Sequence, residues 1–269
     1  MAKLVWDAIG EHFYETGVDH GIVFPVESNG TMPKGFAWNG LTNVSETPSG
    51  AESTEIYADN IKYLDILSAE KFACTIEALY YPKEFAVLDG TASPTEGVNI
   101  GQQARGAFGF AYRSLLGNDV KGNDFGYKLH LIYNLKASPS EKAYSTVNDS
   151  PEAITFSWEC NSTPVTVTGY KPTSLLTIDS TKVDPDKLAS FLEILEGSSG
   201  SVSYNAFSGS SFTPGETYYE QSGSDYIATS DTEPDGSKTY YTKTEIGGSD
   251  ARMPLPDEVI AHFGNGASG

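Results

Sequence analysis

The histidines and their acidic neighbours are the first residues of this 269-residue chain that could do chemistry. His12 and His20 lie close to Glu11, Glu15 and Asp19, and such side chains can bind a metal ion or transfer protons. Their spacing matches no zinc motif of a helix or a hairpin. We therefore interpret His12 and His20 as polar loop residues, and we expect no catalytic site, no metal site and no cofactor.

Other motifs that carry chemistry are missing from the sequence. It contains no G-x-S-x-G nucleophile elbow and no GxxxxGK[ST] phosphate loop. Residues 117–126, GNDVKGNDFG, have the residue types of a calcium loop without its spacing, so a turn is expected there. Cys74 and Cys160 fall on apolar positions of strand patterns, which predicts buried free thiols. The sequence gives no support for a disulfide between them.

The charge of the chain is one-sided, with 17 Lys and Arg against 36 Asp and Glu and a formal net charge of −19. Ordinary nucleic-acid binding needs clustered cations, so this balance argues against it. On charge alone, the favoured interpretation is an acidic protein whose charge prevents association. Arg105 and Arg113 either bridge to acidic groups of a neighbouring molecule or are solvated, and we favour solvation. No apolar run is long enough for a signal peptide or a membrane span, so no membrane insertion is expected.

Alternating apolar and polar residues predict that β-strands dominate. The clearest run is 154–160, where Ile154, Phe156, Trp158 and Cys160 share one face, and a polar turn at 148–151 precedes it. Further strands are predicted at 72–78, 108–116, 127–135, 165–168 and 174–178. In the 127–135 strand, the residues expected on one face are Tyr127, Leu129, Leu131, Tyr133 and Leu135. Turn signals at 117–119 and 122–124 predict a hairpin, and repeated hairpins predict a mainly β protein, an antiparallel sheet curled into a sandwich or barrel.

One flanking α-helix is predicted to cover a face of this sheet. Asp184 provides the N-cap and Pro185 the first turn, and Gly197 ends the helix. The apolar stripe of the helix consists of Leu188, Phe191, Leu192 and Leu195. A weaker helical turn is expected after Pro82. A short helix is expected from Pro256, with Val259, Ile260 and Phe263 on one side.

The composition changes between residues 198 and 248, which are rich in Ser, Gly, Thr and Tyr and nearly free of Leu, Ile and Val. The sequence GETYY at 215–219 is echoed by SKTYY at 237–241, which predicts three short strands. The alternative is a disordered Ser/Gly linker. We expect 198–248 to be a small β-rich surface insertion in a β-domain of residues 1–197 that is completed by 249–264, with 265–269 as a flexible C-terminal tail.

Several stretches of the chain resemble the major tail tube proteins of long, non-contractile-tailed phages that infect Gram-positive bacteria. These stretches are 38–85, 101–134, 141–160, 177–185 and 255–260. The resemblance implies a β-sandwich or barrel subunit that forms hexameric rings, which stack into a tube for DNA ejection. It implies a structural virion protein and not an enzyme, assembled in the host cytoplasm. The implied partners are further copies of itself, the tape measure, the tail tip and the tail terminator, while DNA passes without specific binding.

The resemblance also implies where contacts lie. In tube proteins a long loop between early strands reaches the next ring, and the polar segment 46–55, with 56–60, is the matching part of this chain. The residues expected at ring–ring contacts are Glu46, Glu52, Glu55, Tyr57 and Asp59. Thr75 and Glu77, on the polar face of the 72–78 strand, are expected to line the lumen.

The insertion is expected to contact the host envelope through its tyrosines. These are Tyr218, Tyr219, Tyr226, Tyr240 and Tyr241. They also motivate an alternative of another class, a carbohydrate- or cell-surface-binding β module, because aromatic faces stack on sugar rings. An enzyme has no motif behind it.

Overall fold

The structure is a computed structural model that describes residues 6–144, 146 and 153–264. Contacts divide the chain into two compact units, one containing the residues up to Glu196 and from Ala251 onwards, the other Gly197–Asp250. The turn predicted at 148–151 and the tail predicted at 265–269 lie outside the described residues.

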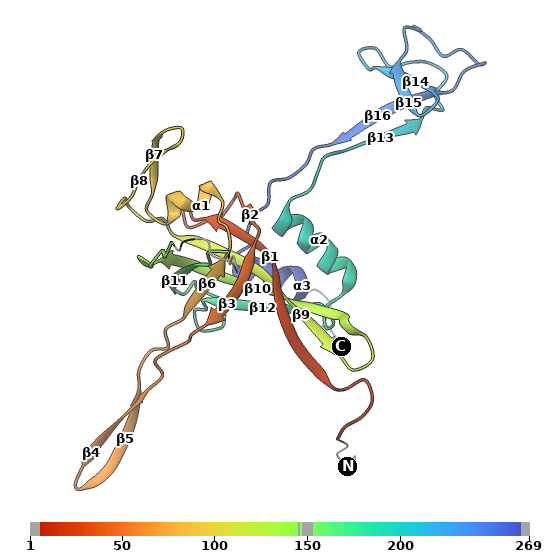
Figure 1. The fold of residues 1–269 in the computed structure, drawn as a ribbon. Helices are drawn as coiled ribbons and strands as arrows, with labels where there is room; N and C mark the ends of the chain where they lie inside the picture. The colour runs from red at the N-terminus through yellow and green to blue at the C-terminus, as the bar shows by residue number, and fades with distance from the viewer. Residues whose placement is uncertain (1–5, 145, 147–152, 265–269) are drawn as a thin grey trace. The chain divides into compact units, whose positions relative to one another are not determined.

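The first unit is built on an antiparallel sheet of eight strands (Figure 1). These are β1 (Phe13–Pro25), β2 (Phe36–Trp38), β3 (Leu41–Glu46), β6 (Ala73–Ala78), β9 (Phe108–Asn118), β10 (Gly122–Ala137), β11 (Phe156–Ser162) and β12 (Leu175–Asp179). Their order is β2-β1-β9-β10-β11-β6-β3, and β12 pairs with β10. Two hairpins, β4 (Ser53–Ala58) with β5 (Ile61–Leu67) and β7 (Ala92–Thr95) with β8 (Val98–Ile100), form small sheets of their own. The predicted mainly β, antiparallel fold is confirmed.

An aromatic core lies against one face of this sheet. Trp158 of β11 is fully buried. Its ring packs edge-on against Trp38, Tyr81 and Phe85, with ring centroids 5.2 to 5.4 Å apart. Phe85 comes from the helix α1 (Lys83–Leu88), which confirms the helical turn predicted after Pro82. The alternation in the 154–160 run therefore does direct its tryptophan into a core.

The two cysteines lie in the same core. Cys74 of β6 is directly opposite Cys160 of β11 in the antiparallel register. Both are buried free thiols, as predicted. The hydrogen bond with Cys74 and, after it, burial raise the pKa of the Cys160 thiol well above its usual range. The thiol is therefore neutral and unreactive, and it acts as a small apolar side chain.

The opposite face of the sheet is covered by α2 (Pro185–Glu196) and α3 (Pro256–Gly264). The carboxylate of Asp184 accepts the backbone N–H of Asp186 at 2.9 Å, so the predicted N-cap is confirmed. Gly197 follows the helix with a φ of +81°, a conformation that glycine adopts without strain. The buried side of α2 is formed by Leu188, Phe191 and Leu195. The helix therefore covers the sheet along the predicted apolar stripe.

Strand β10 differs from its prediction, because it is buried on both faces. Leu131 and Tyr133 belong to the core under α2, whereas Ile132 and Leu135 belong to the aromatic core. Asn134 has a φ of +48°, and the pairing with β9 shifts between Ile132 and Leu135. This bulge adds one residue and moves Leu135 to the other face. The prediction that Leu135 shares a face with Tyr133 is wrong.

Three smaller predictions also differ from the structure. Strands β9 and β10 extend to Asn118 and from Gly122, so most of the residues expected in the turn belong to strands. The segment 165–168 makes only a single bridge, Val165 with Thr173, and is no strand. Ile260 is 45% exposed, so it does not share the buried side of α3 with Val259.

The second unit has four strands where three were predicted. They are β13 (Ser201–Ala206), β14 (Tyr218–Ser222), β15 (Asp225–Ala228) and β16 (Tyr240–Ile246), in the order β13-β16-β14-β15. The sequence repeat is also a structural repeat. Tyr218 and Tyr240 are both buried, and their hydroxyls accept the backbone N–H five residues upstream, from Thr213 at 3.0 Å and Asp235 at 3.1 Å.

Candidate functional site

The segment between β3 and β6 forms an antiparallel ribbon. Beyond β3 and β6, Ser49 and Lys71 exchange two backbone hydrogen bonds of 2.8 and 2.7 Å. Further along, the N–H of Ser68 donates to the carbonyl of Glu52 at 2.9 Å, and β4 and β5 follow directly (Figure 1). The prediction of a loop at 46–55 holds only in part: residues 47–52 belong to no strand and join β3 to β4, but they are partly paired with residues 68–73, and residues 53–55 belong to β4.

A tight turn closes the end of this ribbon. Asp59 and Asn60 have φ values of 51° and 63°, which are the left-handed conformations of a type I′ turn. The residues on either side, Ala58 and Ile61, are paired. On β5 the pairing skips Tyr63, which forms a bulge. Because of this extra residue, Ile61 and Leu64 lie on the same face of the hairpin although they are three residues apart.

One face of the hairpin is apolar. Paired and alternate residues share a face, and on this face they are Thr54, Ile56, Ala58, Ile61, Leu64 and Ile66. The exposed fractions are 39% for Ile56, 64% for Ile61, 39% for Leu64 and 53% for Ile66. In the described chain β4 and β5 pair only with each other. This apolar face therefore lacks the cover that a half-buried sheet normally has.

The other face of the hairpin is polar and internally bonded. Lys62 forms ion pairs with Glu55 at 2.8 Å and with Asp65 at 2.9 Å. The hydroxyl of Tyr57 donates to Glu55 at 2.6 Å. The hydrogen bonds from Lys62 and Tyr57 lower the pKa of the Glu55 carboxyl. The Lys62–Glu55 pair joins β5 to β4, and so does the hydroxyl of Ser53, which donates to Asp65 at 2.9 Å. These cross-strand contacts add to the backbone pairing, so the uncovered apolar face is a defined surface of a paired hairpin.

This geometry places the residues expected at ring–ring contacts in different surroundings. Glu55 and Tyr57 lie on the polar face, Asp59 lies in the turn, and Glu52 lies on the ribbon. Glu46 is not part of the hairpin, because its carboxylate accepts the hydroxyl of Tyr112 at 2.8 Å.

The apolar hairpin residues were missed from the sequence. Ala-Asp-Asn-Ile at 58–61, between alternating apolar residues, is a hairpin signal that could have revealed them. The signal is easily overlooked because acidic residues and Lys62 occur between the apolar ones.

Thr75 and Glu77 lie on the polar face of β6, away from the aromatic core. Glu77 is paired in register with Ser157 and with Asn43, whose amide donates to its carboxylate at 3.3 Å. Thr75 is paired with Glu159 of β11. Neighbouring strands thus extend this polar face, and the expectation that it lines a lumen stays a prediction.

The tyrosines of the second unit are sorted onto two faces of its sheet. Tyr218 and Tyr240 are each 3% exposed, so the prediction that these two make surface contacts is wrong. On the opposite face, Tyr204 and Tyr226 stack at 3.9 Å although β13 and β15 are the edge strands. The sheet is therefore curled, so that side chains of its two edge strands meet above the central strands β16 and β14.

The central tyrosines complete this second cluster. Tyr219 meets Tyr204 edge-on at 5.2 Å, and Tyr241 meets Tyr226 edge-on at 4.9 Å. These ring-to-ring contacts use part of the aromatic surface on which a sugar ring would stack. Host contact through Tyr219, Tyr226 and Tyr241, which are half-buried, stays a prediction.

The two arginines are bound within the first unit, so their interpretation as solvated residues is wrong. Arg105 donates to the buried carboxylate of Asp89 at 2.6 Å. Arg113 forms a two-pronged contact with Asp19 at 2.9 and 3.2 Å and lies over the ring of Tyr127.

The histidines are likewise mostly parts of regular elements. The interpretation as a loop residue is wrong for His20, which lies on β1. His130 and His262 lie on β10 and α3, where a strand and a short helix were predicted. His12 lies outside the strands and contacts Asp119 at 3.2 Å. No group of three or more His, Cys, Asp or Glu side chains in the described part of the chain is placed to hold a metal ion.

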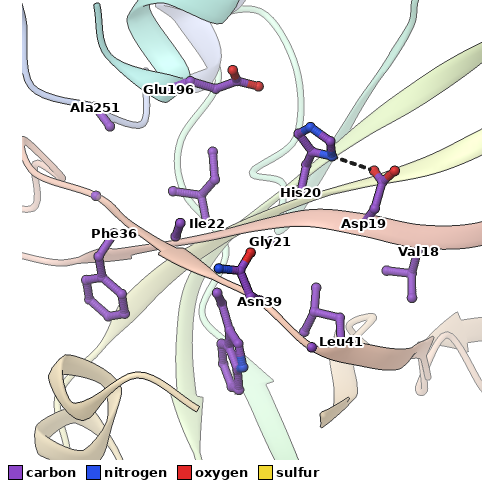
Figure 2. Close-up of a pocket in the computed structure, with 14 residues that line it drawn as sticks. Val18, Asp19, His20, Gly21, Ile22, Phe36, Asn39, Leu41, Glu196 and Ala251 are labelled. Carbon is purple, nitrogen blue, oxygen red and sulfur yellow. Dashed lines mark ion pairs between the residues drawn. The ribbon is translucent and has the colours of Figure 1, made fainter. Parts of the chain in front are cut away.

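A groove of about 520 Å³ runs between β1 and residues 35–41 (Figure 2). Ile22 and Leu41 contribute apolar walls, and Glu196 stands at one end. The ion pair of His20 with Asp19, 3.0 Å long, lies at the rim, where Arg113 also binds Asp19. Asp19 and Arg113 already neutralise one another, and the rim presents no nucleophile beside a base.

In comparisons with known proteins, no family model and no curated protein matches this chain. Within the described residues, no helix is long and apolar enough to cross a membrane.

Proposed function

We propose that this chain is a structural subunit that assembles with copies of itself into the tail tube of a long-tailed phage. The observation that carries the proposal is the hairpin of β4 and β5, whose apolar face is uncovered while its polar face is satisfied internally. A hairpin of two strands is marginally stable alone. A second copy that covers Ile61 and Ile66 would stabilise both the hairpin and the assembly.

The proposed assembly consists of hexameric rings that stack, with the hairpin bridging neighbouring subunits. The resemblance to tail tube proteins supports the ring and the stacking, and the exposed hairpin supports a large contact between copies. The tape measure, the tail tip and the tail terminator are the further partners in this proposal, and the virion is its location.

The charge of the chain supports passage of DNA without adhesion. A net charge of −19 leaves few cations to bind phosphates and release counterions. The polar face that carries Thr75 and Glu77 is the proposed lining of the channel. Carboxylates and hydroxyls there would repel or ignore a polyanion.

Electron microscopy and sedimentation of the purified full chain test the proposal. We expect rings or tubes that form above a threshold concentration. A chain that stays monomeric at high concentration, and is monomeric in virions, would refute it. Retention of such a monomer on a glycan or cell-wall column would instead support a carbohydrate-binding module.

A further inference from the structure

We propose that His130 is a pH-sensitive latch that holds the root of the hairpin ribbon against β1. The latch lies wholly within the first unit and does not depend on the proposed tube. It joins four strands, β1, β3, β9 and β10, through the side chains of Glu15, Glu46, Ser114 and His130.

The latch spans a gap in the sheet. β3 is the last strand of the sheet order and β1 lies near its other end, so the two are not hydrogen-bonded neighbours. A cavity of about 380 Å³ lies between them, lined by Glu15 and Val18 of β1 and by Val44 and Glu46 of β3. His130 forms part of its lining and is only 12% exposed.

The partners of the imidazole are acceptors on both sides. Nε2 lies 2.9 Å from the hydroxyl oxygen of Ser114, and that hydroxyl donates its own proton to Glu15. Nε2 must therefore carry the proton in this hydrogen bond. Nδ1 lies 3.6 Å from a carboxylate oxygen of Glu46 and has no hydrogen-bond partner. A neutral imidazole has only one N–H, so its bare Nδ1 faces a carboxylate.

A second proton on the ring removes this conflict. Protonated His130 donates from both nitrogens, to Ser114 and toward Glu46. Tyr112 supports this arrangement, because its ring stacks on the imidazole at 4.5 Å and its hydroxyl donates to Glu46. The serine is not poised as a nucleophile, since its proton is held by Glu15 and not by the imidazole.

The charges around the imidazole set the sign of the effect. The groups that face it are Glu15, Glu46, Lys128 and the neutral Tyr112 and Ser114, and Cys74 lies beyond Tyr112. His130, and after it the hydroxyl of Tyr112, lower the pKa of the Glu46 carboxyl against the effect of burial. At Glu15, burial raises the pKa of the carboxyl, but the contacts with Lys128 and Ser114 outweigh it and lower the pKa.

Both carboxylates are therefore ionised throughout the range in which imidazoles change charge, about pH 5 to 8. Lys128 neutralises Glu15, with which it pairs at 2.6 Å. Protonation of the imidazole then neutralises the remaining carboxylate, Glu46. The latch should be closed at the acidic end of this range and loosened at the basic end.

The position of Glu46 connects this latch to the ribbon. Glu46 is the last residue of β3, and the next residue, Thr47, begins the ribbon with an N–H bond to Ala73 at 2.8 Å. A closed latch fixes this exit against β1 through Glu15 and Ser114. An open latch leaves the ribbon root held by its backbone bonds alone.

Amide hydrogen exchange on the unassembled full chain tests the latch. The amides of Thr47 and Ser49 report on the ribbon root. We expect their protection, corrected for intrinsic rates, to rise about three- to tenfold from about pH 8 to pH 6 in the wild type. His130→Gln should abolish this rise, while His262→Gln, which changes a half-buried histidine of α3, should keep it.

A second variant keeps the test decisive if His130→Gln folds poorly. Glu46→Gln keeps the shape of the side chain and removes the charge that the imidazolium faces, so the rise in protection should again disappear. Identical pH dependence in wild type and either variant would overturn the latch. Tube formation is not measured here, so failure of the latch and failure of the proposed assembly are separate results.

Discussion

The double substitution Ile61→Ala with Ile66→Ala should weaken self-association and leave the subunit folded. Full burial of an isoleucine side chain contributes about 1.5–3 kcal/mol. Ile61 and Ile66 are 64% and 53% exposed, so a partner can still cover roughly half of each. Truncation of both residues to alanine should then cost about 1.5–2.5 kcal/mol in total for each covered hairpin, which is a roughly 10- to 60-fold weaker association.

Sedimentation velocity across a concentration series measures this shift, and electron microscopy shows whether tubes form. The matched control is Leu67→Ala, which removes a side chain that is 69% exposed but lies on the polar face of the same hairpin. We expect the control to change association less than about threefold. Equal assembly by the double variant and the wild type, or an equal loss in the control, would refute the assignment of the apolar face as the interface.

The remaining predictions address the lumen, the second unit and the root of the ribbon. Glu77→Lys should slow DNA ejection while tubes still assemble, because a lysine binds phosphates; unchanged ejection kinetics would argue against a lumen position. Replacement of 198–248 by a short Gly/Ser link should leave tube formation intact, as seen by electron microscopy, because the unit has its own contacts; loss of tubes would place it in the interface. Glu46→Gln should lower the free energy of unfolding by about 0.5–1.5 kcal/mol between pH 4.5 and 6, where the protonated His130 of the closed latch faces the ionised Glu46. Because the pKa of the Glu46 carboxyl is lowered in the folded chain, the loss of stability should fade as the pH falls below 4.5. Urea titrations at several pH values measure it, and a loss that persists in acid would contradict this reasoning.

Local patterns predicted much of the fold. Alternation placed Trp158 and Cys160 in a core, and capping by Asp184 with a stop at Gly197 placed the one long helix. These predictions hold because side-chain direction and helix ends depend on residues a few positions apart. The repeated Tyr-Tyr sequences likewise predicted a β-rich second unit, although the strand at 201–206 lacked a recognisable pattern.

The candidate site could be recognised only in the tertiary structure, because its residues are defined by pairing partners that are distant in the sequence. The segment 46–55 resembles a loop until residues 68–73 are seen to pair with it. A bulge at Asn134 moves Leu135 between two cores, and no local pattern distinguishes the two faces of a strand that is buried on both.

The latch at His130 also depends on contacts between residues that lie far apart in the sequence. Glu15 and Glu46 reach His130 from strands that lie about 115 and 84 residues before it in the sequence. By itself, the sequence determined the helices and those strands whose side chains alternate clearly, such as β6, β9, β10 and β11. Register, pairing partners and the grouping of distant charges are decided by long-range contacts, so only the folded chain determined which apolar face stays uncovered and which histidine lies among carboxylates.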